Sequence, residues 1–286
     1  MRRPSPIVLV LIGIVSVQLG AGVAKSLFDE VSPTVIVWLR LVTSAAVLAA
    51  YARPRLRGRT RHDWLVVLGF GASLGLMNLA IYQSFARIPL GIAVTIEFIG
   101  PLALAVLGSR RARDLLWVGL AAIGVALLGM ERADLDPVGV LWALLAGAMW
   151  ATYIVLSGET GRRWDGLGGL AAASVIAALL ISPLLALSDS ALAEGLRSPH
   201  ILVLGAVVGL LSSVVPYSCE LVALRSMRAA TFGILMSLEP AAAALVAIIV
   251  LGELLSPLQW LAVLCVIGAS IGATRERGTL AEPVPA

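Results

Sequence analysis

Charge is scarce in this sequence. Only 13% of its 286 residues are Asp, Glu, Lys or Arg, whereas an average soluble protein has about 25%. Hydrophobic residues make up 59% of the chain, and the mean hydropathy is +0.98. This composition excludes a sizeable soluble domain and is typical of a polytopic helical membrane protein.

Cysteine and histidine are almost absent, with two residues of each type. Cys219 and Cys265 both fall inside apolar stretches, which favours a packing role over a disulfide. No cluster of His, Cys, Asp and Glu has the spacing of metal ligands, and no phosphate-binding loop or serine-nucleophile motif is present. We therefore expect no metal site, no cofactor and no enzymatic activity.

Long apolar stretches dominate what remains. A membrane-spanning helix needs about 20 mainly apolar residues. Arg2 and Arg3 precede the first stretch, as in a signal peptide, but no clear cleavage site ends it, so we interpret it as a spanning helix. The sequence thus predicts an all-α fold of ten transmembrane helices, at roughly 7–25, 33–51, 64–86, 90–108, 115–130, 137–156, 168–187, 200–223, 229–251 and 257–274.

Basic residues are unevenly distributed among the connections. If the N-terminus is cytoplasmic, sixteen of the 21 Lys and Arg residues fall on the cytoplasmic side and four on the opposite side, with Arg40 inside a helix. Such an asymmetry predicts that both termini lie in the cytoplasm. The net charge of +4 reflects these topology signals, so the expected partner is the lipid bilayer and not nucleic acid.

Two parts of the chain share an unusual pattern. Glu97 and Glu239 each stand six residues after a glycine, inside an apolar stretch, with Pro101 or Pro240 close behind. Five helices per copy is an odd number, so the second copy would enter the membrane from the opposite side, as in many secondary transporters. We predict two inverted five-helix repeats and a disordered tail, at 6–130, 137–275 and 276–286.

The two glutamates are the main candidates for chemistry. A charge at the centre of a membrane helix costs roughly 2.5–3.5 kcal/mol on insertion scales, so something must compensate for it or use it. Glu97 and Glu239 would either exchange protons and bind the ammonium group of a solute, or cap backbone that the nearby prolines leave unpaired.

Other polar and aromatic residues also fall at membrane depth. Asn78, the only asparagine in the chain, and Tyr82 share one helix face, where they would bind a solute or join helices. Arg40 would bind a substrate carboxylate, neutralise Glu97, or snorkel towards the interface. The remaining candidates for binding or coupling are Gln18, Trp150, Tyr153, Tyr217 and Glu220.

Several short strings of residues resemble a known family. They are Ala24-Lys25-Ser26-Leu27-Phe28, Pro89-Leu90-Gly91-Ile92-Ala93-Val94, Glu97-Phe98, Gly100-Pro101-Leu102, Pro216-Tyr217-Ser218, Thr231-Phe232-Gly233 and Glu239-Pro240. In these strings the chain resembles the drug/metabolite transporter superfamily with EamA-type repeats, and within it the bacterial inner-membrane threonine/homoserine exporters. The resemblance covers about residues 6–275. It implies ten helices, an inverted repeat and proton-driven export of small amino acids, and it assigns no binding residues.

Two transport hypotheses follow. In the first, the chain exports threonine- and homoserine-like amino acids by proton antiport, and Glu97 with Arg40 or Asn78 holds the zwitterion. In the alternative, the same fold exports an aromatic amino acid, a purine derivative or a cationic drug, which an aromatic wall of Trp38, Trp150 and Tyr153 would favour. A membrane sensor or embedded enzyme is a third hypothesis, but the sequence contains no catalytic constellation or soluble output domain.

Overall fold

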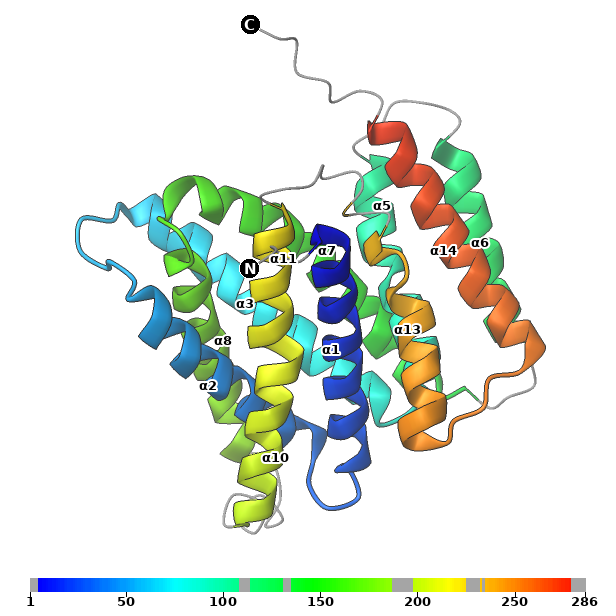
Figure 1. Ribbon diagram of the computed structural model, residues 1–286, viewed down its shortest axis with the longest axis horizontal. Coiled ribbons are helices and arrows are strands. Elements are labelled where there is room, and N and C mark those ends of the chain that lie inside the picture. Colours follow the sequence, from blue (N-terminus) through cyan, green and yellow to red (C-terminus); the bar gives the residue numbers. More distant parts are fainter. Residues whose placement is uncertain are drawn as a thin grey trace, which may run out of the picture.

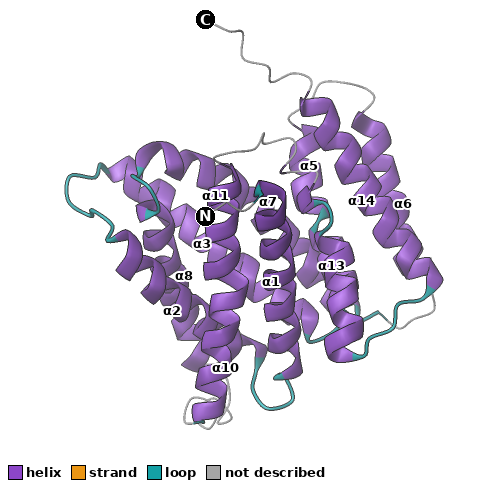
Figure 2. Ribbon diagram, viewed as in Figure 1, coloured by secondary structure: helices purple, strands orange, loops and turns teal. Residues whose placement is uncertain are grey.

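The computed structural model describes residues 5–107, 114–130, 135–186, 198–224, 232 and 235–278. Within these ranges all regular elements are helices and none is a strand (Figures 1 and 2). Six of the described helices are long and apolar enough to cross a membrane, and shorter apolar helices accompany them at Leu90–Leu104, Glu239–Leu251 and Pro257–Gly272. The predicted all-α polytopic architecture is confirmed, whereas the ten-helix repeat stays a prediction.

The first half of the chain begins its helices with recognisable signals. Proline occupies the first position of three helices, where its missing N–H has no intrahelical partner to lose. Another helix starts with a capping box between Thr60 and Asp63. The helices are α1 (Pro6–Ser26), α2 (Pro33–Ala52), α3 (Arg61–Phe85), α4 (Leu90–Glu97), α5 (Ile99–Leu107), α6 (Asp114–Met130) and α7 (Pro137–Arg163).

The second half contains two short π-helical segments, η1 and η2. Its elements are α8 (Gly168–Ala186), α10 (Pro199–Gly209), η1 (Leu210–Val214), α11 (Val215–Leu224), α13 (Glu239–Val246), η2 (Ala247–Leu251) and α14 (Pro257–Gly278). The helix α14 continues to Gly278, three residues into the stretch predicted to be disordered. The rest of that stretch, 279–286, lies outside the described residues.

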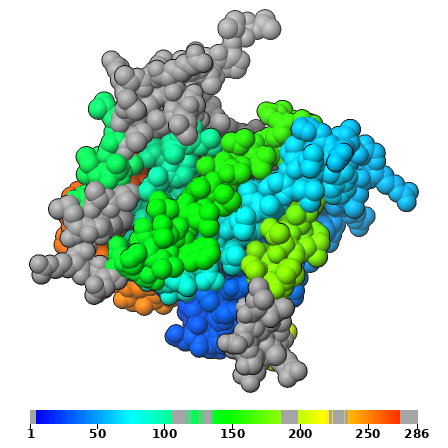
Figure 3. Space-filling view, turned by 180° about the vertical axis from the view of Figure 1, so that it is seen from behind, coloured from blue at the N-terminus to red at the C-terminus, as the bar shows by residue number. Residues whose placement is uncertain are grey.

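Helices that are distant in the sequence pack side by side. In Figure 1, α6 and α14 lie together at one edge, and α2, α3 and α8 lie together at the opposite edge. The helix α7 packs along α3 and crosses the back of the molecule as a continuous green band in Figure 3. Its outward side chains include Leu141 and Val155, which are more than half exposed. An apolar outer surface of this kind suits contact with lipid.

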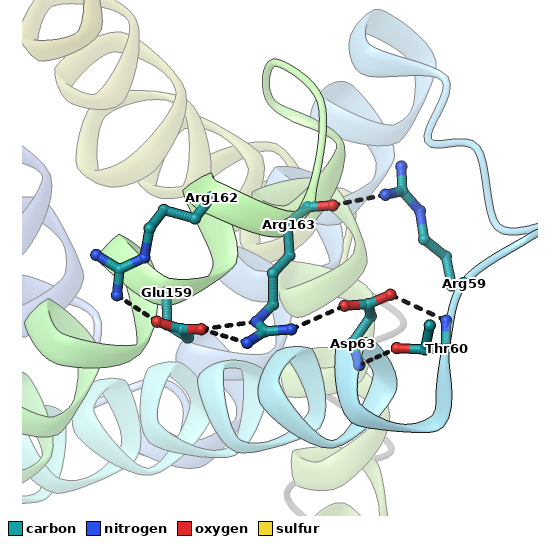
Figure 4. Close-up of polar contacts among 6 residues, drawn as sticks. All are labelled: Arg59, Thr60, Asp63, Glu159, Arg162 and Arg163. Atoms are coloured by element: carbon teal, nitrogen blue, oxygen red, sulfur yellow. Dashed lines mark hydrogen bonds and ion pairs between the residues drawn. The ribbon is translucent and has the colours of Figure 1, made fainter.

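Charged side chains gather at the end of the bundle where α3 begins and α7 ends (Figure 4). Arg163 contacts Asp63 at 3.3 Å and Glu159 at 2.6 Å. Arg59 donates to the Arg163 carbonyl oxygen at 2.6 Å. This network ties the connection before α3 to the last turn of α7, and it places charge at one end of the bundle and away from the apolar surface.

Candidate functional site

A cavity of about 140 Å³ lies at the centre of the bundle, where α1, α2, α3, α4, α7, α11 and α13 meet. We call it the central cavity. All ten residues that the sequence offered for binding or coupling line it, and these are Gln18, Arg40, Asn78, Tyr82, Glu97, Trp150, Tyr153, Tyr217, Glu220 and Glu239. The fold therefore brings the candidates together in one place, while the role of each remains a prediction.

Helix ends place two of the carboxylates. The predicted span 90–108 is divided, because α4 ends at Glu97 and α5 begins at Ile99. Pro101 lacks the N–H that would bond the Glu97 carbonyl four residues earlier. Glu239 is the first residue of α13 and is buried. Thus one glutamate closes a helix and the other opens one, and both side chains reach the central cavity.

Glycine lets the break after α4 lie directly against α7. A Cβ atom added to Gly147 would stand 2.6 Å from the Glu97 carbonyl oxygen, and one added to Gly100 would collide with the Gly147 carbonyl. On the other side of α4, a Cβ atom at Gly91 would stand 2.9 Å from Ala244 Cα of α13. Backbone contact on both sides holds the end of α4, and with it Glu97, in position.

Acidic residues outnumber basic residues in the described lining of the central cavity. Glu97, Glu220 and Glu239 line it, and Arg40 is the one basic residue among the described residues that line it. No ion pair within 4.0 Å joins Arg40 to a carboxylate in the described part of the chain. The cavity therefore offers both signs of charge to a solute, with an excess of acceptors.

Arg40 is buried, and its guanidinium is held by three hydrogen bonds. Nε donates to Ser213 Oγ at 3.2 Å, Nη1 to the Tyr82 hydroxyl at 3.3 Å and Nη2 to the Ser212 carbonyl at 2.9 Å. The guanidinium carbon also stands 5.5 Å from the centre of the Tyr82 ring. The alternative in which Arg40 snorkels to the interface is wrong, because these partners hold it at the cavity.

Comparison with known proteins identifies the family. Residues 137–275 match the EamA-like transporter family. Over 272 residues the chain is 43% identical to the threonine/homoserine exporter RhtA of Escherichia coli strain K12, covering 94% of this chain and 91% of that relative. The chain belongs to the EamA-like transporter family.

Other relatives agree with this assignment. The threonine/homoserine exporter RhtA of Salmonella typhimurium strain LT2 is 42% identical over 272 residues, with 94% of this chain and 91% of the relative covered. The uncharacterized transporter YwfM of Bacillus subtilis strain 168 is 31% identical over 168 residues. This match covers 57% of this chain and 55% of YwfM. A crystal structure whose sequence is 20% identical superposes on this chain with a TM-score of 0.64. The match covers 96% of this chain and 99% of the chain in that structure, and it supports the fold alone. This transporter is thus a multi-pass protein of the bacterial inner membrane.

The π-helical segment η1 shapes one wall of the transporter's central cavity. Within it, the Leu211 carbonyl accepts from Ser16 Oγ at 2.7 Å and the Ser212 carbonyl accepts from Arg40. A π segment turns backbone groups away from their usual helical partners and is frequent at functional sites. Ser212 and Ser213 are not among the predicted site residues, although two adjacent serines in an apolar stretch are a signal.

Asn78 and the aromatic residues complete the wall. The Asn78 amide donates to the Leu74 carbonyl of its own helix at 2.8 Å, so this bond joins no other helix. Trp150 packs edge-on against Phe98, with ring centres 5.3 Å apart. Trp38 is absent from the lining, because its Nε1 donates to Ser182 of α8 at 2.9 Å. The predicted aromatic wall is therefore correct for Trp150 and Tyr153 and wrong for Trp38.

Beyond one end of the central cavity, an ion pair joins three parts of the transporter. Lys25 Nζ, near the end of α1, lies 2.5 Å from Glu253 and donates to the Ile88 carbonyl at 2.8 Å. Glu253 also accepts from the Leu90 backbone N–H at 2.8 Å. Ala21, one turn before Lys25, lines the cavity. This Lys25–Glu253 bridge therefore lies next to the cavity and ties α1 and α4 to the connection before α14.

The hydrogen bonds of Arg40 lead to a prediction about stability. Replacing Arg40 by Lys keeps the charge but removes the planar fork that reaches Tyr82, Ser212 and Ser213 together. Hydrogen bonds to charged groups contribute about 1.5–3 kcal/mol each, so we expect the free energy of unfolding to fall by about 2–4 kcal/mol. Unfolding of both proteins in mixed micelles with increasing amounts of denaturing detergent would measure this difference in the free energy of unfolding.

A matched control uses another arginine on the same bundle. Arg87 is about one-third exposed and pairs with Asp136 at 3.6 Å, so Arg87→Lys should change the free energy of unfolding by less than about 1 kcal/mol. Equal effects of the two substitutions would show that the buried hydrogen bonds of Arg40 contribute nothing specific.

Proposed function

We propose that this transporter exports threonine, homoserine and similar small amino acids across the inner membrane in exchange for protons. The observation that carries the proposal is the central cavity, where one arginine and three glutamates face the same small space inside an apolar bundle. A zwitterion needs an acceptor for its ammonium group and a donor for its carboxylate, and both are present. The identity to threonine/homoserine exporters supports the same substrate class.

The hydrogen bonds of Arg40 support a specific way of binding the solute carboxylate. A guanidinium has five N–H donors, and three hydrogen bonds to the protein leave two of them for a ligand. Because the protein already orients the fork, little conformational freedom is lost when a carboxylate binds. In this arrangement Glu97 receives the ammonium group. The Asn78 side-chain nitrogen donates to the Leu74 carbonyl, so the amide oxygen is left to accept a hydrogen bond from the solute hydroxyl.

Competition at Glu97 would couple the two fluxes. A carboxylate in an apolar cavity is stabilised either by a bound ammonium group or by a proton, and it cannot hold both. The transporter would therefore release the amino acid on the side where Glu97 takes up a proton. Alternation between the two occupied states gives antiport without any further energy source.

The same proposal includes the arrangement of the helices. We infer ten spanning helices in two inverted five-helix repeats, 6–130 and 137–275, with both termini in the cytoplasm. The family match to 137–275 and the contact between α4 and α13, which carry the two glutamates, support this division. In this orientation the charged network of Figure 4 faces the cytoplasm, and the Lys25–Glu253 bridge faces the outside.

Export then requires the Lys25–Glu253 bridge to open. We expect Glu253→Gln to favour the state open to the outside, since the amide still accepts from Leu90 but no longer attracts Lys25. In a protein lacking Cys219 and Cys265, a cysteine at Ala21 should react several-fold faster with a membrane-impermeant maleimide added outside.

Arg87→Gln provides the control for this labelling, because it removes a more exposed ion pair with Asp136 from the same end of the transporter. Labelling should remain at the starting rate in that variant. An unchanged rate in Glu253→Gln would rule out the bridge as a closure.

The proposed function is tested by uptake of labelled threonine into liposomes that contain only this protein. Antiport predicts faster uptake when the interior is more acidic than the outside, and competition by homoserine. No uptake by a folded, inserted preparation would contradict the substrate assignment. An aromatic amino acid, a purine derivative and a cationic drug belong in the same competition panel, because Trp150, Tyr153 and Tyr217 also line the cavity.

A further inference from the structure

The connection between α2 and α3 is densely positive, and we call its residues 53–61 the arginine loop. It contains Arg53, Arg55, Arg57, Arg59 and Arg61. All of these except Arg59 are exposed, and their side chains make no hydrogen bond or ion pair within the part of the chain that the structure describes. Acidic residues at this end of the bundle are already paired. Asp63 and Glu159 contact Arg163, and Asp165 contacts Arg59. Four guanidinium groups are therefore left without a counter-ion among the described residues.

The backbone of the arginine loop is held in place, although the loop projects from the edge of the bundle in Figure 1. Arg59 donates to the Arg163 carbonyl, as Figure 4 shows, and its guanidinium carbon stands 4.6 Å from the centre of the Trp164 ring. At the other end of the loop, a Cβ atom at Gly168 would be in van der Waals contact with Pro54, 3.6 Å from its Cα. A fixed loop loses less conformational entropy when its free side chains bind a ligand.

The free arginines lie where two apolar helix faces end. On α3, Leu65 and Leu68 follow Arg61 by four and seven residues, so the three side chains share one face of the helix. Leu65 is 59% exposed and Leu68 is 46% exposed. On α2, Tyr51 lies one turn after Val47, directly before the loop, and is 79% exposed. Because such faces contact acyl chains, the arginines at their ends lie at the depth of the lipid headgroups.

We propose that the arginine loop is a binding site for the headgroup of an anionic phospholipid. A guanidinium binds phosphate oxygens in a bidentate geometry, and no carboxylate among the described residues competes for these four. Clusters of about four to eight basic residues beside a spanning helix are typical of binding to anionic lipids. Leu56, in the middle of the loop, is 51% exposed and adds an apolar contact for the acyl chains. A segment that only determined topology would need positive charge, but neither a fixed backbone nor an adjoining apolar face.

Native mass spectrometry of the full-length protein tests this site, with phosphatidylglycerol and phosphatidylcholine added in equal amounts in a mild detergent. We expect the unsubstituted protein to retain phosphatidylglycerol in preference to phosphatidylcholine. Each basic residue near an anionic surface favours binding roughly fivefold. Replacing the four free arginines by Gln should therefore lower the affinity of the most tightly bound phosphatidylglycerol by about 10-fold or more and leave phosphatidylcholine unaffected. The double variant Arg53→Gln with Arg61→Gln should show a smaller loss.

Arg162→Gln is the matched control, because Arg162 is exposed at the same end of the bundle but already contacts Glu159. This variant should retain phosphatidylglycerol as the unsubstituted protein does. The double variant keeps most of the topology signals, so it decides the question if the fourfold variant does not insert, and an unchanged affinity in it would contradict the proposal.

Two further results would overturn the lipid site. One is equal affinity of the unsubstituted protein for the two lipids, or a preference that survives in the fourfold variant. The other is displacement of the lipid by excess inorganic phosphate, which would assign the arginine loop to the free anion. None of these results depends on which solute the transporter carries, so the proposed function stands or falls separately.

Discussion

Replacement of Glu97 by Gln is expected to abolish the response of threonine flux to a pH gradient. Glutamine has nearly the same shape and can still hydrogen-bond in the central cavity, but it takes up no proton over the working pH range. It also removes the negative charge that would face the ammonium group. Hydrogen bonds to charged groups contribute about 1.5–3 kcal/mol, so affinity should fall about 10- to 100-fold.

The decisive quantity is a ratio of rates and not a rate. Uptake with an acidic interior is divided by uptake without a gradient, so differences in the amount of inserted protein cancel. We expect this ratio to fall to one in Glu97→Gln and to stay at its original value in Glu30→Gln, since Glu30 is exposed in the α1–α2 connection. A ratio that survives in Glu97→Gln would remove Glu97 as the coupling residue. Glu239→Gln and Glu220→Gln would then be compared in the same way.

Replacement of Gly100 by Ala is expected to have the largest effect on the fold. The added methyl group would collide with the Gly147 carbonyl oxygen of α7, which is backbone and cannot rotate away. Overpacking of a well-packed interior typically lowers the free energy of unfolding by about 1–3 kcal/mol. We expect a loss of about 3 kcal/mol or more here, because the neighbour is backbone and cannot move aside. The helices must separate, and the end of α4 that carries Glu97 moves with them.

Matched glycines provide the controls for this prediction. An added Cβ atom would meet nothing within 4 Å at Gly158 of α7 or at Gly119 of α6. Alanine at either position should leave the unfolding midpoint unchanged or raise it slightly, because alanine has the better helix propensity. Gly147→Ala should resemble Gly100→Ala. Equal midpoints for Gly100→Ala and Gly158→Ala would show that α5 and α7 are not packed as closely as the structure indicates.

Residues at membrane depth were identifiable from the sequence because the bilayer makes polarity expensive. A carboxylate, an arginine or an asparagine inside an apolar stretch needs a reason, and the ten candidates chosen on that basis all line the central cavity. The same logic failed for Trp38. An indole is tolerated in apolar packing, so its presence in a span does not distinguish the wall of a cavity from a contact with Ser182.

Long-range partners could not be predicted in this way. Lys25 and Glu253 are far apart in the sequence, and nothing local to either residue indicates the other. The π segment at Ser212 and Ser213 is a change of hydrogen-bond pattern within a continuous apolar helix, which composition does not reveal. A second cavity, of about 380 Å³, is lined by residues of α3, α7, α8 and α11, so it has no signature in any one of these helices.

The sequence by itself determined that this chain is an all-helical membrane protein and which side chains are too polar to face lipid. Both follow from transfer energies, which depend on residue type and on the length of an apolar stretch. Only the tertiary structure decided that Arg40 donates hydrogen bonds to η1 and α3, and that Glu97 lies at a helix end held by Gly147. These properties depend on distances between distant segments, and helix packing sets those distances.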